Sequence, residues 1–191
     1  MDGAEQLDQV MPLLVAVVGR IEPGQLDDPT PCANFTVAGV LDHMIGGARA
    51  FAPAFRGEPA PAVEPASPKG NQLERFGQAM ADLLDAVHSP GAQDRRITAP
   101  IGEVPGAVFA RFVAFDGLVH GWDLATATGQ TYAPAESLVA EVDAFARQAL
   151  TPEMRDGDTF ATEADAPDDA DLLERLVAFS GRQLPNTETN R

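Results

Sequence analysis

The residues best placed to do chemistry lie between Phe109 and Ala125, where a carboxylate and an imidazole are one helical turn apart. Asp116 and His120 are separated by four positions, so on a helix both side chains project from the same face. The hydrophobic residues around them recur at intervals of three and four, which predicts one buried stripe. A buried carboxylate without a partner costs several kcal/mol, so something must compensate Asp116.

A divalent metal ion is one way to compensate this carboxylate, and the chain holds only three histidines from which a further ligand could come. His43 lies at the edge of the apolar face of an earlier predicted helix. If the two helices are neighbours, His43, Asp116 and His120 form one set of ligands. Imidazole and carboxylate donors suit zinc, nickel, iron or manganese, and three protein ligands leave room for water or substrate.

The spacing alone leaves other interpretations open. A single Asp-x-x-x-His pair is more often an intrahelical hydrogen bond or an ion pair, and a paired arginine would also compensate the acid. Asp123 could accept a hydrogen bond that orients a histidine, or could be an ordinary cap. Trp122 could be packing or could line a pocket. His88 is expected to end a helix, and Cys32 could be a small packed residue or a reactive thiol.

Hydrophobic periodicity indicates which elements position these side chains. Proline-rich residues 57–70 are expected to form a loop, Thr36 a helix N-cap, and residues 96–105 a short hairpin around a glycine turn. The expected helices are residues 3–21, 37–55, 71–87, 107–128 and 135–150, with a short closing helix over 172–179.

This order of elements predicts an all-α fold. It is an up-down four-helix bundle with a long crossover, a short hairpin and a small C-terminal helical extension. We expect one domain over residues 1–185 and a disordered tail over residues 186–191.

Composition narrows the class of partner. Thirteen basic against 29 acidic residues give a formal charge of −16, which disfavours nucleic acid and anionic membrane surfaces. One cysteine rules out an intramolecular disulfide. The N-terminus lacks the basic region of a signal peptide, and no apolar run is long enough to span a bilayer. The expectation is a cytoplasmic protein that binds a small molecule.

Two segments resemble the mycothiol-dependent maleylpyruvate isomerase N-terminal family of the DinB-like superfamily. Residues 30–43, TPCANFTVAGVLDH, resemble its T-P-C-x-x-W-x-V-x-x-L-x-x-H signature, and residues 116–125, DGLVHGWDLA, resemble E/D-x-x-x-H-G-W-D-L-A. Residues 176–182, LVAFSGR, are similar to the L-x-x-F-x-G-R ending of an actinobacterial branch. The likeness spans nearly the whole chain.

The resemblance implies a DinB-type bundle with a metal, zinc before nickel, iron or manganese, held by His43, Asp116 and His120. It also implies mycothiol as a cosubstrate, Asp123 orienting a ligand, and Trp122 with the proline-rich loop bordering a pocket. The function implied is a metal- and thiol-dependent transferase or isomerase acting on a small electrophile. A homodimer is expected by analogy with the superfamily. The alternatives are a non-catalytic metal-binding stress-response module and a purely structural bundle.

The chain departs from the isomerase in two ways. The isomerase has glutamate where this chain has Asp116, so the shorter arm must be met by a helix shift, an intervening water or a weaker metal site. The isomerase also has a C-terminal domain that contributes to its active site, and only about sixty residues follow the second motif here. Maleylpyruvate is therefore not the expected substrate. Phe35 replaces the tryptophan of the signature and keeps an aromatic anchor.

Overall fold

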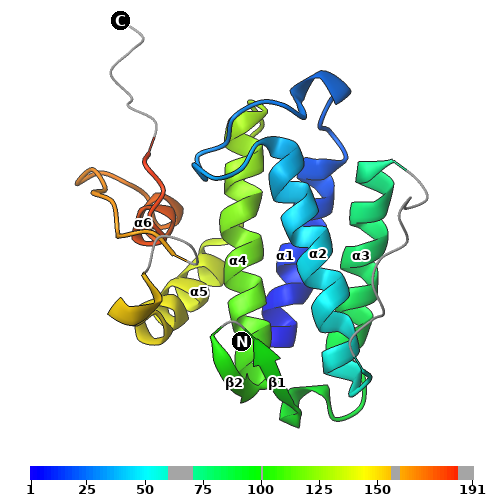
Figure 1. Ribbon diagram of the computed structural model, residues 1–191. Coiled ribbons are helices and arrows are strands. Elements are labelled where there is room, and N and C mark those ends of the chain that lie inside the picture. The colour runs from blue at the N-terminus through cyan, green and yellow to red at the C-terminus, as the bar shows by residue number, and fades with distance from the viewer. Residues whose placement is uncertain (60–70, 100, 156–159, 185–191) are drawn as a thin grey trace, which may run out of the picture.

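Four long helices lie side by side in the computed structural model, which describes residues 1–59, 71–99, 101–155 and 160–184 (Figure 1). They are α1 (Gly3–Val18), α2 (Val37–Arg56), α3 (Gln72–Val87) and α4 (Gly106–Ala127). Helix α1 packs mainly against α4 and α2 against α3, while contacts of α1 with α3 and of α2 with α4 close the bundle. The predicted all-α bundle is confirmed.

Two further helices form the C-terminal extension. Helix α5 (Glu136–Ala149) packs against α4, and the short α6 (Leu172–Phe179) packs against both α5 and α4. Both lie on the side of α4 that faces away from α3 (Figure 1). Helix α4 is therefore the bundle helix that contacts both helices of the extension, and it can connect residues of the bundle to residues of the extension.

The helix boundaries follow local signals. Thr36 Oγ1 accepts a hydrogen bond from the Gly39 amide at 3.2 Å, so the predicted N-cap of α2 is confirmed. Helix α2 ends at Gly57, whose φ of 73° is accessible to glycine without strain. Helix α1 ends at Val18, three residues before the predicted end. The hydrophobic spacing extended the predicted helix to Ile21, because this residue is buried in the core even though the chain has already turned after Gly19.

A two-stranded hairpin leads into α4, as predicted. Strand β1 (Arg96–Ala99) pairs antiparallel with β2 (Gly102–Pro105). The Gly106 amide then donates to the Arg95 carbonyl at 2.7 Å, which joins the first residue of α4 to the start of the hairpin. The hairpin thereby sets the position of the N-terminal end of α4.

The predicted single buried stripe on α4 is wrong. Every residue from 117 to 125 is buried, because α1 and α2 cover one side of the helix and α5 and α6 cover the other. Asp116 lies at the edge of this covered region, and 44 % of its side chain is exposed. The acid that the pattern placed in the interior thus faces a cleft.

Parts of the predictions lie outside the described residues. Of the predicted loop 57–70 only residues 57–59 are described, and the predicted disordered tail 186–191 is not described at all. Within the described ranges, no helix combines the length and the apolar character needed to cross a bilayer.

Candidate metal centre

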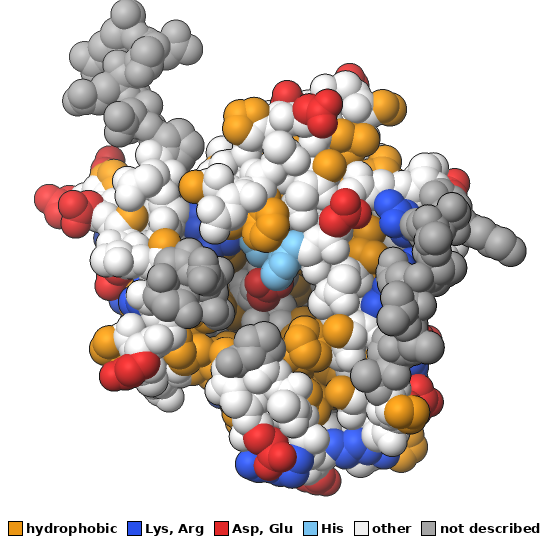
Figure 2. All heavy atoms as spheres, in the orientation of Figure 1, with side chains coloured by type: hydrophobic (Ala, Val, Ile, Leu, Met, Phe, Trp, Pro, Cys, Tyr) orange, Lys and Arg blue, Asp and Glu red, His pale blue; other side chains and the backbone are white. Residues whose placement is uncertain are grey.

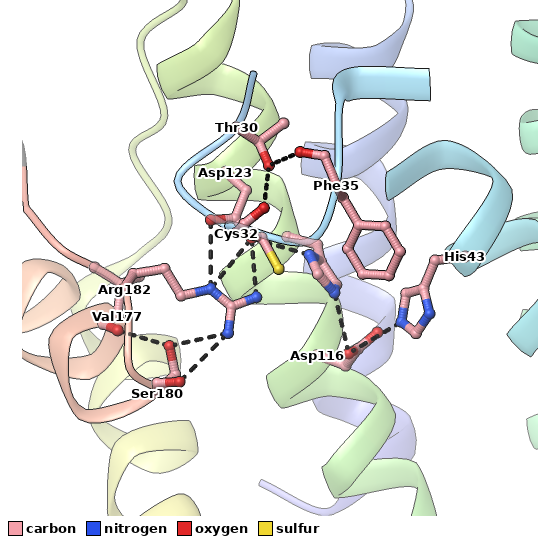
Figure 3. A network of polar contacts seen from close by, with 10 residues as sticks. Thr30, Cys32, Phe35, His43, Asp116, Asp123, Val177, Ser180 and Arg182 are labelled. Carbon is pink, nitrogen blue, oxygen red and sulfur yellow. Dashed lines mark hydrogen bonds and ion pairs between the residues drawn. The ribbon is translucent and has the colours of Figure 1, made fainter. Parts of the chain in front are cut away.

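Three side chains from two helices meet at the middle of the bundle. His43 comes from α2, and Asp116 and His120 come from α4, where the four-residue spacing puts both on one face. Asp116 Oδ1 lies 3.6 Å from His43 Nε2 and 3.4 Å from His120 Nε2. Figure 3 shows the His43 ring and the Asp116 carboxylate pointing toward each other from their two helices. The two helices are neighbours, as the ligand set required, and the three residues therefore come together.

The distances suit a shared metal ion. Two donors on a tetrahedral ion with bonds of about 2.0–2.2 Å are about 3.4 Å apart. The two measured separations from Asp116 are close to that value, and the three donor atoms all lie within 4.8 Å of one another. The shorter acid therefore reaches both imidazoles without an intervening water. Nitrogen and oxygen donors of this kind can hold zinc or another divalent transition metal.

The three side chains differ in exposure. The His120 side chain is only 5 % exposed, whereas His43 and Asp116 are 42 % and 44 % exposed. His120 is therefore held within the protein, and the other two present an open side to molecules from the solvent. Figure 2 shows this open side as a hollow at which histidine and carboxylate side chains meet.

The charges of Asp116 and its neighbouring histidines shift the pKa values within the cluster. Desolvation favours the neutral form of Asp116, but the charge and hydrogen bonds of His120 and His43 outweigh it and hold its pKa well below the usual range. Burial alone would lower the pKa of His120, yet Asp116 and Asp123 raise it to about 9. Without a metal, the cluster is an ion pair of carboxylate and imidazolium.

Asp123 orients His120 from the opposite side. His120 Nδ1 lies 2.9 Å from Asp123 Oδ2, and this carboxylate is fully buried. When Nδ1 donates to Asp123, the lone pair of a neutral imidazole is on Nε2, which faces Asp116. This is the arrangement in which a carboxylate fixes the tautomer of a metal-binding histidine.

Arg182 is the member of the site to which the sequence analysis gave no role, although it ends the segment that resembles L-x-x-F-x-G-R. It follows α6, and its Nη2 donates to Asp123 Oδ2 at 3.0 Å (Figure 3). A turn at Gly181, with a φ of 96°, precedes it. The available signal was this motif, in which the arginine directly follows a glycine just after the predicted closing helix. The chain beyond α4, although short, thus contributes a residue to the site.

Two residues of the first motif lie against the histidines. The Phe35 ring centroid is 5.3 Å from that of His43 and 6.3 Å from that of His120. Cys32 Sγ lies within 4.8 Å of donor atoms of His120 and Asp123. Burial raises the pKa of the Cys32 thiol, and the Arg182 guanidinium only partly offsets this. Cys32 is therefore a protonated thiol at neutral pH.

Trp122 does not border the open side. It is buried in the core, only 9 % exposed, and is not among the described residues that line the cavity. Two helical positions after His120, it points about 200° away around the helix axis. The burial of Trp122 agrees with its alternative role in packing, and its place beside a pocket stays a prediction.

A cavity of about 170 Å³ opens beside His43 and Asp116. It extends between the four bundle helices toward the hairpin, and its other described lining residues are hydrophobic or glycine. A metal ion held by the three side chains would therefore have an apolar space next to it.

Comparison with known proteins gives the family. The family described as "Mycothiol maleylpyruvate isomerase N-terminal domain" matches residues 7–125, which include His43, Asp116, His120 and Asp123. Two uncharacterized proteins of Mycobacterium tuberculosis, from strains CDC 1551 / Oshkosh and ATCC 25618 / H37Rv, are each 34 % identical over 171 residues. Each alignment covers 88 % of this chain and 91 % of the relative.

No solved structure matches the chain. The mostly helical architecture agrees with an all-α DinB-like fold. The family match spans more than half of the chain, from α1 to near the end of α4. This protein belongs to the mycothiol maleylpyruvate isomerase N-terminal domain family.

Proposed function

We propose that this protein binds a divalent metal ion, zinc first, through His43, Asp116 and His120. With a low-molecular-weight thiol, mycothiol in the cytoplasm of an actinobacterial cell, it acts as a transferase or isomerase on a small electrophile. The observation that carries the proposal is the approach of Asp116 Oδ1 to both imidazole Nε2 atoms at ligand-to-ligand distances. The family match supports the choice of thiol.

The three metal-binding residues would have different roles, because they differ in exposure to solvent. His120 is buried and held by Asp123, so it would be a fixed ligand. His43 and Asp116 are partly exposed, so substrate and thiol can approach from their open side. A divalent metal ion, when bound there, supplies a Lewis acid that favours the thiolate form of a thiol. The apolar cavity would exclude water from the electrophile beside it.

The reaction would begin with an S–C bond formed between the thiolate and an activated double bond, whose electron pair moves onto the conjugated carbonyl. In an isomerisation, rotation about the resulting single bond follows. The carbonyl electrons then re-form the double bond, and the S–C bond breaks to return the thiolate. In a transfer, a proton from solvent completes the adduct, which is the product.

Metal content tests the first half of the proposal. Protein purified without a nickel column should contain close to one divalent metal ion per chain by elemental analysis, and His120→Ala should contain almost none. His88→Ala is the matched control, because His88 lies on the surface with its Nε2 2.8 Å from Asp8 Oδ1. A wild-type protein without metal would contradict the proposal.

Thiol consumption tests the second half. Mycothiol and a panel of α,β-unsaturated carbonyl compounds should react faster with the metal-loaded protein than with the chelator-treated protein or with His120→Ala. Metal binding without any acceleration across the panel would contradict the enzymatic proposal. It would favour the alternative, a non-catalytic metal-binding stress-response module.

A further inference from the structure

The cavity beside the candidate metal centre has one polar end. His43 and Asp116 line that end, and the remaining described lining residues come from α1 to α4 together with Ile101 and Phe160. In Figure 2, hydrophobic side chains border the hollow below the histidine and carboxylate side chains. A molecule in the cavity would therefore meet polar groups with one part and hydrocarbon with the rest.

The charges around the cavity disfavour an anion. No lysine or arginine is among the described residues that line it, and His43 and Asp116 are the only titratable side chains among them. The Arg111 guanidinium of α4 lies over the Phe145 ring, 4.4 Å from its centroid, and is not among the described residues that line the cavity. A carboxylate at the end of this space away from His43 and Asp116, and so away from a bound metal ion, would lose its hydration without gaining a cation.

The size and lining suit one small ring. A cavity of about 150 Å³ lined by hydrophobic side chains is known to bind benzene, and this one is about 170 Å³. Phe51 and Phe109 meet in it edge to face, with their centroids 4.6 Å apart. Met44 and Met80 add flexible, polarisable side chains that adapt to a bound ring.

We propose that the electrophile is an uncharged molecule with a hydrophobic body about the size of one aromatic ring. Its reactive end would lie at His43 and Asp116, and its body would occupy the space between Phe51, Phe109 and Met80. The inference rests on the proposed function and narrows its substrate to uncharged aromatic or compact aliphatic compounds. Small dicarboxylates such as maleylpyruvate fall outside this class.

Two adjacent glycines of α2 provide a matched pair of variants. Gly47 lines the cavity, and a Cβ placed there would meet only Phe51, at an ordinary contact distance of 3.9 Å. A Cβ on Gly46 would meet nothing within 4 Å. Leucine favours a helix more than glycine does, so both Gly47→Leu and Gly46→Leu should fold. Only the first puts a side chain into the cavity.

Binding of toluene to the protein as purified tests the cavity without any reaction. Saturation-transfer NMR should detect toluene on the wild type and on Gly46→Leu, with affinity reduced about tenfold or more on Gly47→Leu. Maleate at equal concentration should not displace toluene. Equal binding by both variants, or displacement by maleate, would overturn the inference. Toluene has no group that binds a metal or reacts with a thiol, so this result is independent of the proposed function.

Turnover tests the same inference at the reactive end. Benzylideneacetone and its para-carboxylate share one electrophilic group, and the second adds a charged carboxylate at the far end. The methyl ester of the para-carboxylate, which is uncharged and larger still, controls for size. Benzylideneacetone should have a kcat/KM about tenfold or more higher than its para-carboxylate. Equal values, or a preference for the carboxylate, would overturn the inference while leaving thiol-dependent catalysis in place. Toluene binding without turnover of either compound would instead count against the proposed function alone.

Discussion

Arg182 and Asp123 form an ion pair, with Arg182 Nη2 and Asp123 Oδ2 3.0 Å apart although the residues are 59 positions apart in the chain. The same Asp123 oxygen lies 2.9 Å from His120 Nδ1. One buried carboxylate thus connects the C-terminal extension to an imidazole of the candidate metal centre. Arg182 is the partner of this carboxylate that stays charged when His120 is neutral, so the extension contributes to the centre through this residue.

Arg182→Met should therefore weaken both folding and metal binding. In the metal-bound protein, where His120 is neutral, it leaves Asp123 buried without a cation, which costs about 3–5 kcal/mol of unfolding free energy. A histidine that loses its oriented acceptor typically binds metal about 10–100-fold more weakly. Urea denaturation and metal titration measure the two effects. Arg175→Met is the control, since the exposed Arg175 side chain donates to the Asp168 carbonyl and has no carboxylate partner among the described contacts. Equal stability of the two variants would contradict the assignment.

Asp116→Glu should bind metal about tenfold or more weakly than the wild type. Asp116 Oδ1 already lies 3.4 Å and 3.6 Å from the two imidazoles, so an added methylene carries the carboxylate past the best position. Metal titration with a competing chelator measures the change. Asp42→Glu, the same substitution on the exposed residue before His43, should leave the affinity unchanged. Tighter metal binding by Asp116→Glu would contradict the view that the aspartate side chain has the right length for this site.

The metal-free protein should lose stability as pH rises through the slightly alkaline range. The pKa of His120 is raised to about 9 from an ordinary value of 6.5, so its stabilising contribution is complete below pH 6.5 and lost by about pH 9. The lowered pKa of Asp116 has the opposite effect on stability. Its contribution to the free energy of unfolding is present above the ordinary pKa of 3.8 and is lost only as the pH falls below that value. The Tm of chelator-treated protein should fall between pH 6.5 and 9. Asp116→Asn should flatten this decline, and an unchanged slope would contradict the ion pair.

Metal affinity should show the opposite dependence on pH. A metal ion must displace the proton from His120, so apparent affinity should increase about tenfold per pH unit from pH 6 up to about 9. Titrations at several pH values measure this slope. An affinity that does not change over this range would mean that His120 is not a ligand.

Gly121→Ala should destabilise the protein by about 1–3 kcal/mol. A Cβ at this position would lie 2.5 Å from Tyr132 Oη, and this hydroxyl is buried without a hydrogen-bond partner among the described residues. Tyr132→Phe removes the nearest atom and an unsatisfied polar group, so it should restore part of the loss in the double variant. Thermal denaturation of the single and double variants measures the coupling. Gly46→Ala, where the added Cβ meets nothing, serves as the control.

The local features of the protein could be predicted from its sequence because they depend on neighbouring residues. The convergence of Asp116 and His120 follows from the helical repeat, and the start of α2 follows from the Thr36 hydroxyl that caps it. The hairpin before α4 likewise follows from β-branched residues around a glycine turn. Each of these needs no knowledge of how the helices pack.

Only the tertiary structure decided which distant residues complete the site. His43 joins Asp116 rather than lying apart because α2 packs against α4, and the periodicity of either helix carries no record of its neighbour. Periodicity also could not show that other helices cover α4 on both sides. This packing buries Trp122 and leaves Asp116 at the cleft. Arg182 reaches Asp123 only because α6 docks on α4 and the chain turns at Gly181. Spacing determines contacts within one helix, whereas contacts between elements depend on packing of the whole chain.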